Sequence, residues 1–373
     1  MATVVTARQK TPDGLRQDLL ELTSLRFFAA FYVVLFHIHD KLAQLSSIST
    51  NFFQKGYIGV DLFFILSGFI LTHAYLDKYL AGKFDYRQFL LFRIARIYPL
   101  HLVMTLVFVA FYAIGTLLGV TSNGQGMRWD HLGQHLLMLH AWGTTDWHSW
   151  NFPSWSISAE FFAYLLFPIY LLTTRIPVAL GLALSVALYV AFYFIVEMSG
   201  ARLTALMFNF GILRIVPEFL LGVFIYLFIR KFEIASGLAK FALGVTVIGL
   251  LVGFHLGISD IILVPVLGFL ILLIGTLSLG SEENVLRSKP LVYLGEISYS
   301  TYMVHILVLI CFTVLSRKLG SGSEFPLVLW LVMLAAIYVA SAASYHFVEH
   351  PARALIRRWS TPKPGKKVGR TAA

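Results

Sequence analysis

The stretch LRFFAAFYVVLFHIHD, residues 25–40, decides what kind of protein this is. It is almost entirely apolar, yet Arg26 lies near its start and His37 near its end. On an α-helix these two residues share one face and are separated by roughly 16 Å along the axis. An ionisable residue inside an apolar span is costly and is a functional-site hypothesis by default. His39 and Asp40, which follow, are expected to be interfacial polar residues.

The composition places most of the chain in a membrane. Of its 373 residues, 58% are hydrophobic and only 13% are charged, whereas soluble domains carry roughly 25% charged residues. So little charge cannot cover the surface of a water-soluble fold of this length. The apolar runs are continuous rather than alternating, which indicates transmembrane helices. The expected fold class is therefore an all-α integral membrane protein.

The hydropathy pattern predicts about ten transmembrane helices. The expected spans are 22–39, 56–77, 98–119, 154–174, 178–197, 211–229, 237–256, 261–280, 292–316 and 325–347. The apolar segment 131–142 is too short to cross easily, so it is expected to be interfacial or re-entrant. With a cytoplasmic N-terminus, 22 of the 29 Lys and Arg residues fall on the cytoplasmic side and 6 outside. This distribution follows the positive-inside rule and predicts that both termini are cytoplasmic.

The chain is expected to have three parts. Residues 1–21 form a polar cytoplasmic segment, residues 22–350 a multi-pass domain, and residues 351–373 a basic, disordered cytoplasmic tail. The net charge of +10 arises between the spans and in the tail, so it indicates topology and contact of the tail with anionic lipid rather than nucleic-acid binding. The single cysteine, Cys311, excludes an intrachain disulfide.

Buried carboxylates in the spans need partners. Asp61 lies in the second span, GYIGVDLFFILSGFIL, on the same face as Gly68, and is expected to pair with a neighbouring helix. Arg214 and Glu218 are four residues apart in LRIVPEFLLG and are expected to form an ion pair. These groups favour structural roles slightly over catalysis.

Other polar residues point to chemistry. Arg93 and Arg96 share a helix face, and paired guanidinium groups suit a phosphate or pyrophosphate, although ordinary positive-inside charge also explains them. Glu160, one turn past Ser156 in WNFPSWSISAEFFAYLLFP, is the carboxylate least easily explained by structure alone. The predicted topology places it on the same side of the membrane as His37.

A polar stripe also runs through the ninth span. In YLGEISYSTYMVHI, Ser298, Tyr302 and His305 follow one another at helical spacing on one face. Such a stripe through an apolar helix usually faces a bundle interior or a cavity.

Together these motifs resemble those of the membrane-bound acyltransferase-3 family, which includes bacterial O-acetyltransferases of O-antigen, exopolysaccharide and other surface sugars. The resemblance covers about residues 20–355. The family's motifs are matched in order by Arg26 to His37 (Arg, ten residues, His), GVDLFFILSGF at 59–69, Arg93 and Arg96 (Arg-x-x-Arg), PSWSISAE ending at Glu160, and SYSTYMVH ending at His305. The departures, Ile157 and Met303 in place of Leu, occur at apolar positions.

The resemblance implies an O-acyltransferase of the bacterial cytoplasmic (inner) membrane. The donor would be cytoplasmic acetyl-CoA or another acyl-CoA, and the acceptor a hydroxyl of a cell-surface carbohydrate or lipid-linked sugar. Acyl-CoA would be a co-substrate, with no bound cofactor and no metal. Polysaccharide-assembly proteins are further expected partners.

Residue roles follow from the resemblance. His37 would be the general base on the acceptor hydroxyl, because an imidazole titrates near physiological pH. Glu160 would orient or charge-balance His37, or bind the sugar. The donor phosphates would be bound by Arg93 and Arg96, with help from Arg26. The residues expected to line a channel or the acceptor site are Asp61, Ser67, Tyr302 and His305. Direct transfer and an acyl-enzyme on His37 or a serine both remain open.

Other function classes fit part of the pattern. A transporter or flippase for a sugar or lipid-linked substrate also places polar residues inside a bundle, but the two halves of the chain show no convincing repeat. Within the enzyme class, the acceptor could instead be a lipid, a peptidoglycan sugar or a small metabolite, and the donor a succinyl or longer acyl group. A non-catalytic scaffold would not require this many buried polar groups.

Overall fold

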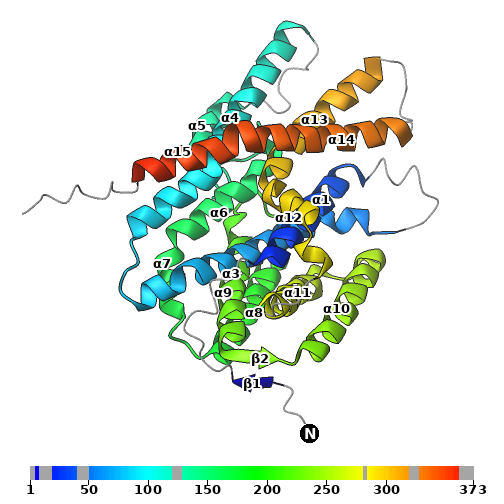
Figure 1. The fold of residues 1–373 in the computed structure, drawn as a ribbon. Helices are drawn as coiled ribbons and strands as arrows, with labels where there is room; N and C mark the ends of the chain where they lie inside the picture. The colour runs from blue at the N-terminus through cyan, green and yellow to red at the C-terminus, as the bar shows by residue number, and fades with distance from the viewer. Residues whose placement is uncertain are drawn as a thin grey trace, which may run out of the picture.

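The computed structural model describes residues 5–7, 19–39, 50–119, 128–279, 284–318 and 327–360. Figure 1 shows the chain as a bundle of helices with one small sheet. The elements in chain order are β1 Val5–Ala7, α1 Leu20–His37, η1 Phe53–Ile58, α3 Gly59–Leu80, α4 Tyr86–Leu117, η2 Trp129–His131, α5 Leu132–Leu136, η3 Phe152–Ser154, α6 Trp155–Leu165, α7 Phe167–Thr173, α8 Val178–Met198, η4 Leu203–Ala205, α9 Ile212–Lys231, β2 Phe232–Ile234, α10 Ser236–Leu256, α11 Asp260–Ser278, η5 Val285–Arg287, α12 Lys289–Glu296, α13 Ser298–Lys318, α14 Leu327–Ser344, η6 Tyr345–Glu349 and α15 His350–Ser360.

The described residues confirm the predicted all-helical membrane fold. Nine of their helical segments are long and apolar enough to cross a membrane, and the bent pair α6–α7 makes a tenth candidate. The axes of this pair meet at 58°. The bend falls where Pro168 opens α7, because proline supplies no backbone N–H to continue the helix. The small antiparallel pairing of β1 with β2 was not predicted.

The third predicted span begins earlier in the structure than expected. α4 starts at Tyr86 rather than at residue 98. Asp85 caps it by accepting hydrogen bonds from the backbone N–H groups of Arg87 (2.9 Å) and Gln88 (3.1 Å). Pro99, which was expected to open the span, lies inside the helix. α4 therefore carries the Arg-x-x-Arg pair on its own body rather than on a preceding loop.

Other expected limits also differ. The ninth predicted span, 292–316, is interrupted at Ile297, which separates α12 from α13. Segment 131–142 contains the short helix α5 followed by turns, while the broken helix pair is α6–α7. In the tail that was expected to be disordered, residues 351–360 are helical in α15, and 361–373 lie outside the described residues.

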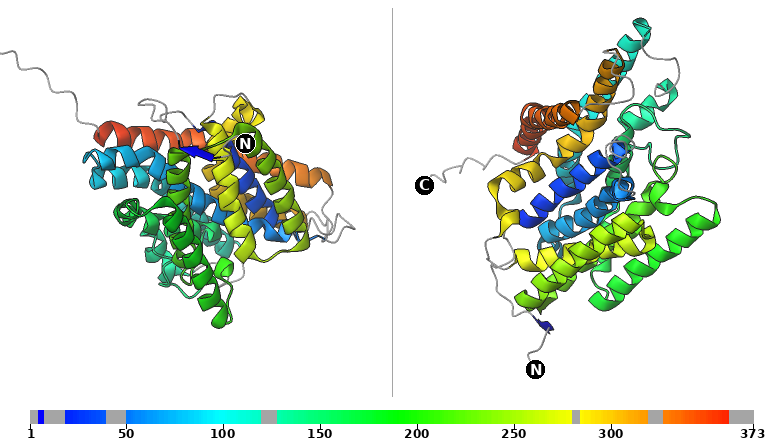
Figure 2. Two further views of the ribbon diagram at one scale, coloured as in Figure 1. Left: turned by 90° about the horizontal axis from the view of Figure 1, so that it is seen from below. Right: turned by 90° about the vertical axis from the view of Figure 1, so that its right-hand side faces the viewer.

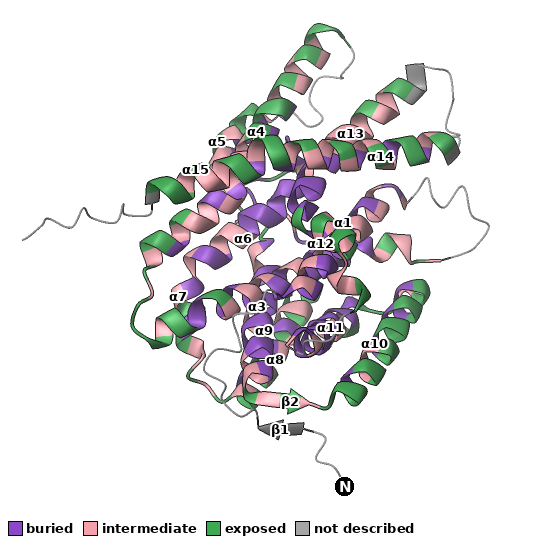
Figure 3. Cartoon of the chain, in the orientation of Figure 1, coloured by how far each residue is buried: buried purple, intermediate pink, exposed green. Residues whose placement is uncertain are grey.

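Helix α3 lies at the centre of the bundle and packs along α9. Two glycines let the backbones of these helices touch. A Cβ at Gly68 would lie 2.0 Å from the carbonyl oxygen of Phe219, and one at Gly222 would lie 1.9 Å from that of Ile65. Gly59 permits a similarly close approach to α1, since a Cβ there would lie 2.7 Å from the carbonyl oxygen of Ala29. Figure 3 shows that α3 and α9 are largely buried, whereas α10 is largely exposed.

The C-terminal helices form a second layer. α14, η6 and α15 follow one another as a long rod that crosses the bundle (Figure 1). α14 packs against α13, and α15 packs against α4. Figure 2 shows the same rod from two other sides, with α4 beside α15. This layer brings Glu349 to the arginines of α4, which positions part of the site described next.

Candidate active site

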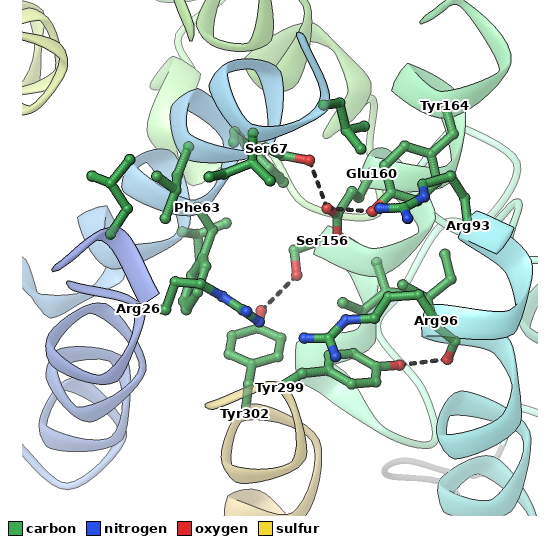
Figure 4. Close-up of a pocket in the computed structure, with 18 of the residues that line it drawn as sticks. Arg26, Phe63, Ser67, Arg93, Arg96, Ser156, Glu160, Tyr164, Tyr299 and Tyr302 are labelled. Atoms are coloured by element: carbon green, nitrogen blue, oxygen red, sulfur yellow. Dashed lines mark hydrogen bonds between the residues drawn. The ribbon is translucent and has the colours of Figure 1, made fainter. Parts of the chain in front are cut away.

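The residues predicted to bind a donor converge on one cavity. It has a volume of about 210 Å³ and is lined by side chains from α1, α3, α4, α6 and α13. Figure 4 shows that the guanidinium groups of Arg26, Arg93 and Arg96 all point into this space. Ser67 and Glu160 line it as well. We call it the arginine cavity.

The three arginines differ in how far their charge is already neutralised. Arg96 Nη1 donates to Glu349 Oε1 at 2.5 Å, and the same carboxylate accepts hydrogen bonds from Ser300 and Arg353. Arg26 makes no hydrogen bond or ion pair with the described residues, and Nε of Arg93 is shielded from solvent without a partner among them. Both side chains are half-buried, and a cation in such a place is stabilised by an anion that pairs with it directly. Arg26 and Arg93 are therefore the groups in this cavity that an anionic ligand would complete.

Glu160 belongs to the arginine cavity and makes no contact with His37. Its Oε1 accepts hydrogen bonds from the hydroxyls of Ser67 (2.8 Å) and Tyr164 (2.6 Å). Figure 4 shows both bonds beside the Arg93 guanidinium. The geometry thus gives no support to the expected role of Glu160 in orienting His37. It does support a role of Glu160 in balancing the positive charge of the arginines. The Tyr164 contact was missed, although its spacing of four residues from Glu160 signals it.

His37 lines a second cavity, of about 550 Å³. The walls come from α1, η1, η3 and η4, together with single residues of α3, α6, α9, α10 and α13 and residues of the connecting loops. The aromatic residues that line it are Phe36, Tyr57, Phe152, Trp155 and Tyr302. Lys55, Arg202 and Arg214 supply its cationic groups. We call it the histidine cavity.

The contacts of His37 determine which of its nitrogens is basic. His305 Nδ1 lies 2.7 Å from the carbonyl oxygen of Tyr302, so this nitrogen carries the hydrogen and Nε2 of His305 is an acceptor. His37 Nδ1 lies 2.9 Å from the carbonyl oxygen of Val33 and 3.3 Å from His305 Nε2. A hydrogen on His37 Nδ1 serves both acceptors. This arrangement leaves a lone pair on His37 Nε2, which is shielded from solvent and has no partner within the described part of the chain.

Tyr302 joins the two cavities and is fixed in place. Its hydroxyl accepts a hydrogen bond from Ser156 Oγ and donates one to the carbonyl oxygen of Pro153, both at 2.8 Å. Of the four residues predicted to line a channel or the acceptor site, Ser67 and Tyr302 line a cavity. Asp61 and His305 line neither cavity. Asp61 contacts Arg214 instead, and His305 contacts His37.

Asp61 holds Arg214 in the histidine cavity. Arg214 Nη2 donates to both carboxylate oxygens of Asp61, at 2.9 and 2.7 Å, and its guanidinium lies 4.8 Å from the ring centroid of Trp155. The predicted pairing of Asp61 with a neighbouring helix is therefore confirmed. The predicted Arg214–Glu218 ion pair is wrong, since Arg214 forms its bidentate contact with the facing helix rather than along its own.

A histidine cluster behind η3 was missed. The rings of His135 and His140 stack with centroids 3.8 Å apart, and the ring of His101 lies parallel to that of His140 at 5.8 Å. Burial lowers the pKa of His140 to about 3, with His101 adding to the effect. The repeated histidines of HLGQHLLMLH at 131–140 were the available signal. No three His, Cys, Asp or Glu residues in the described ranges are arranged to hold a metal ion.

A multi-pass helical protein with a basic cavity, an aromatic cavity and a free imidazole nitrogen has the features of a membrane enzyme that transfers a group between two substrates. Comparison with known families makes this specific. The acyltransferase domain of the acyltransferase-3 family matches residues 19–345. The chain belongs to this family and is a membrane acyltransferase, as the motifs had predicted.

Several curated proteins are similar over most of the chain. It is 32% identical to acyltransferase MdmB of Streptomyces mycarofaciens, over 91% of this chain and 93% of MdmB. It is 27% identical to the exopolysaccharide production protein ExoZ of Rhizobium meliloti, over 87% of this chain and 95% of ExoZ. The peptidoglycan O-acetyltransferase OatA of Listeria monocytogenes is 22% identical over 91% of this chain, which spans only 56% of OatA. No solved structure gives a match.

Proposed function

We propose that the chain transfers an acetyl group from cytoplasmic acetyl-CoA to a hydroxyl of a cell-surface or lipid-linked carbohydrate, with His37 as the general base. The observation that carries this proposal is that His37, whose Nε2 has no partner among the described residues, lines an aromatic cavity that adjoins a cavity lined by three arginines. The relatives ExoZ and OatA, which are named for exopolysaccharide production and peptidoglycan O-acetylation, support a sugar acceptor.

The arginine cavity suits the donor. Phosphate groups are recognised by guanidinium forks, and Arg26 and Arg93 have no anionic partner among the described residues. Glu160, held by two hydroxyls, keeps part of the positive charge balanced when the donor is absent. A thiol-linked arm that reaches inward from these arginines meets Tyr302, which also lines the histidine cavity.

The histidine cavity suits a sugar. Aromatic faces stack against the apolar C–H faces of pyranose rings, and five aromatic side chains line this space. Lys55 is already paired with Asp260 at 2.7 Å and Arg214 with Asp61, so both cations are fixed rather than free. Their remaining donor hydrogens can orient hydroxyl groups of the acceptor.

The chemistry then follows from the orientation of His37. Nε2 removes the proton of the acceptor hydroxyl while the hydroxyl oxygen attacks the thioester carbonyl. The carbon–sulfur bond breaks, the new ester forms, and the proton passes from the imidazolium to the CoA sulfur. His305 accepts the Nδ1 hydrogen of His37 and so keeps Nε2 unprotonated before each attack. This proposal is direct transfer, without an acyl-enzyme.

The experiment uses the purified full-length chain in lipid nanodiscs with [¹⁴C]acetyl-CoA and a panel of oligosaccharides. Wild type is expected to form labelled, alkali-labile sugar esters. His37→Gln is expected to lower the transfer rate by about 10²-fold or more, the usual contribution of a general base. The matched control is His346→Gln, which changes an exposed histidine outside both cavities that lies beside Tyr293 of α12 and Tyr345. Near-normal transfer by His37→Gln would rule out His37 as the base, and sugar uptake into proteoliposomes of the same protein without label transfer would favour a transporter.

A further inference from the structure

Two side chains belong to the lining of both cavities and so form part of the wall between them. Val60 from α3 and Tyr302 from α13 line both cavities, and no other described residue does so. Tyr302 is buried, and its hydroxyl is held by Ser156 and Pro153 as described above. Its ring meets Phe63 edge-on with centroids 6.4 Å apart. We call Val60 and Tyr302 the partition.

Under the proposed function, the reacting carbonyl has to lie at the partition. The donor sulfur arrives from the arginine cavity, whereas the hydroxyl and His37 lie in the histidine cavity. The thioester carbon is bonded to the donor sulfur and is attacked by the oxygen of the acceptor hydroxyl. It can therefore lie only where the two cavities meet. The alkyl tail of the acyl group extends beyond that carbon, so it packs directly against Val60 and the Tyr302 ring.

We propose that the partition is a specificity determinant that restricts the donor to short acyl groups. This inference rests on the proposed function and names the class of acyl chain that the same site accepts. Protein interiors are close-packed, so each added methylene has to displace neighbouring atoms. Room for a longer tail requires the Tyr302 ring to turn away, which breaks both of its hydrogen bonds.

The arginine cavity offers a long tail no alternative place. Its volume of about 210 Å³ has to admit the pantetheine arm of the donor as well. The histidine cavity is larger, at about 550 Å³, but the acceptor occupies it during transfer. Acyl length is therefore limited at Val60 and Tyr302 rather than in either cavity.

The test compares acetyl-, butyryl- and hexanoyl-CoA with the purified full-length chain in nanodiscs. The readout is release of free CoA thiol, which is seen whether water or an oligosaccharide is the acceptor. Wild type is expected to use acetyl-CoA best. In Tyr302→Ala the ratio of hexanoyl to acetyl turnover is expected to rise by about tenfold or more, the size of discrimination that single methylene groups give in apolar pockets.

Three further variants separate acyl length from other roles. Val60→Ala opens the partition from the opposite side without touching a hydrogen bond, and should raise the butyryl to acetyl ratio. Tyr302→Phe keeps the ring but loses both hydrogen bonds, so it should relax the preference less than Tyr302→Ala does. Val339→Ala removes the same two methyl groups from an exposed position on α14 and should leave the ratio unchanged.

The outcomes are distinct. Unchanged donor ratios in folded Tyr302→Ala and Val60→Ala would overturn the inference, as would a wild type that uses hexanoyl-CoA as well as acetyl-CoA. An equal loss with every donor in Tyr302→Phe would assign the hydroxyl to proton transfer and overturn the length role. A wild type that releases CoA from none of the three donors would instead refute the proposed function.

Discussion

A single imidazole nitrogen determines what the histidine cavity can do. His37 has two acceptors within reach of Nδ1 and none for Nε2 among the described residues. The sequence predicted His37 as the base but assigned its support to Glu160. Support comes from His305 instead, on a helix more than two hundred residues later in the chain. Spacing within one helix cannot show which distant helix packs against it, so this partner was identified only as part of a polar stripe.

His305 is expected to be a positioning residue for His37. Replacing it by phenylalanine removes one of the two acceptors of the Nδ1 hydrogen while keeping a planar ring, so that only the carbonyl oxygen of Val33 still holds the tautomer with a free Nε2. We expect His305→Phe to lower kcat by about tenfold or more with little change in KM for acetyl-CoA. His305→Gln supplies an amide oxygen as acceptor and should recover much of this loss. Equal losses of kcat in both variants would show that the role is only structural.

At the scale of helices, the close contact of α3 with α9 was predictable in part. The sequence indicated that Gly68 allows close helix approach, but it could not identify Gly222 as the matching residue. The two glycines are far apart in the chain. The need for a small residue at each of them comes from the backbone of the facing helix, which the local sequence does not reveal. The bend between α6 and α7 and the early start of α4 were missed for a related reason. A hydropathy pattern shows where the chain is apolar over a long stretch. Capping residues and prolines determine where a helix begins and ends.

Gly222→Ala is therefore expected to force α9 away from α3. A Cβ at this position would overlap the carbonyl oxygen of Ile65, so the helices have to shift, at a cost of about 1–3 kcal/mol for overpacking. The measurement is thermal unfolding of the detergent-purified protein. Gly244→Ala on α10 is the control, because no atom lies within 4 Å of the added Cβ. Equal stability of the two variants would contradict the tight α3–α9 contact.

The histidine cluster, in the loop before η3, should make the free energy of unfolding depend on pH. The pKa of His140 is about 3 in the folded protein and about 6.5 in an unfolded chain. The stabilising contribution of the neutral ring is therefore complete above about pH 6.5 and declines as the pH falls below it, by about 1.4 kcal/mol per pH unit.

This decline should appear as a lower unfolding temperature between pH 7 and pH 5. His140→Gln keeps a polar group near Ser154 but cannot titrate, so its unfolding temperature should depend less on pH. The control is His255→Gln, which changes an exposed histidine at the end of α10. Parallel pH curves for wild type and His140→Gln would show that the cluster does not titrate on unfolding.

For the whole molecule, the proposed direction of transfer requires a defined orientation in the membrane. The charge distribution predicts that both termini are cytoplasmic. With this orientation, the arginine cavity is expected to face the side of acyl-CoA and the histidine cavity the other side. Helix class and family could be predicted from sequence because composition and ordered motifs are properties of the whole chain. The separation of the two cavities could not, because it depends on how the helices pack around Tyr302.

Cysteine labelling in intact cells tests this orientation. In a Cys311→Ser background, which removes the native thiol, Trp147→Cys in the exposed loop before η3 should react with a membrane-impermeant maleimide. Arg358→Cys on α15 should react only after the cells are permeabilised. Labelling of Arg358→Cys in intact cells would place the arginines on the outer side and remove the route from cytoplasmic acyl-CoA.

The partition has one more consequence, for the cell rather than for the reaction. Under the proposed function, the acyl group passes from one face of the membrane to the other along a path that ions could also follow. Among the described residues, only Val60, with its isopropyl group, and Tyr302, with its phenol ring, line both cavities. On that proposal, Val60 and Tyr302 also limit the leakage of ions, and a wider opening for longer acyl groups would weaken the proton gradient across the membrane.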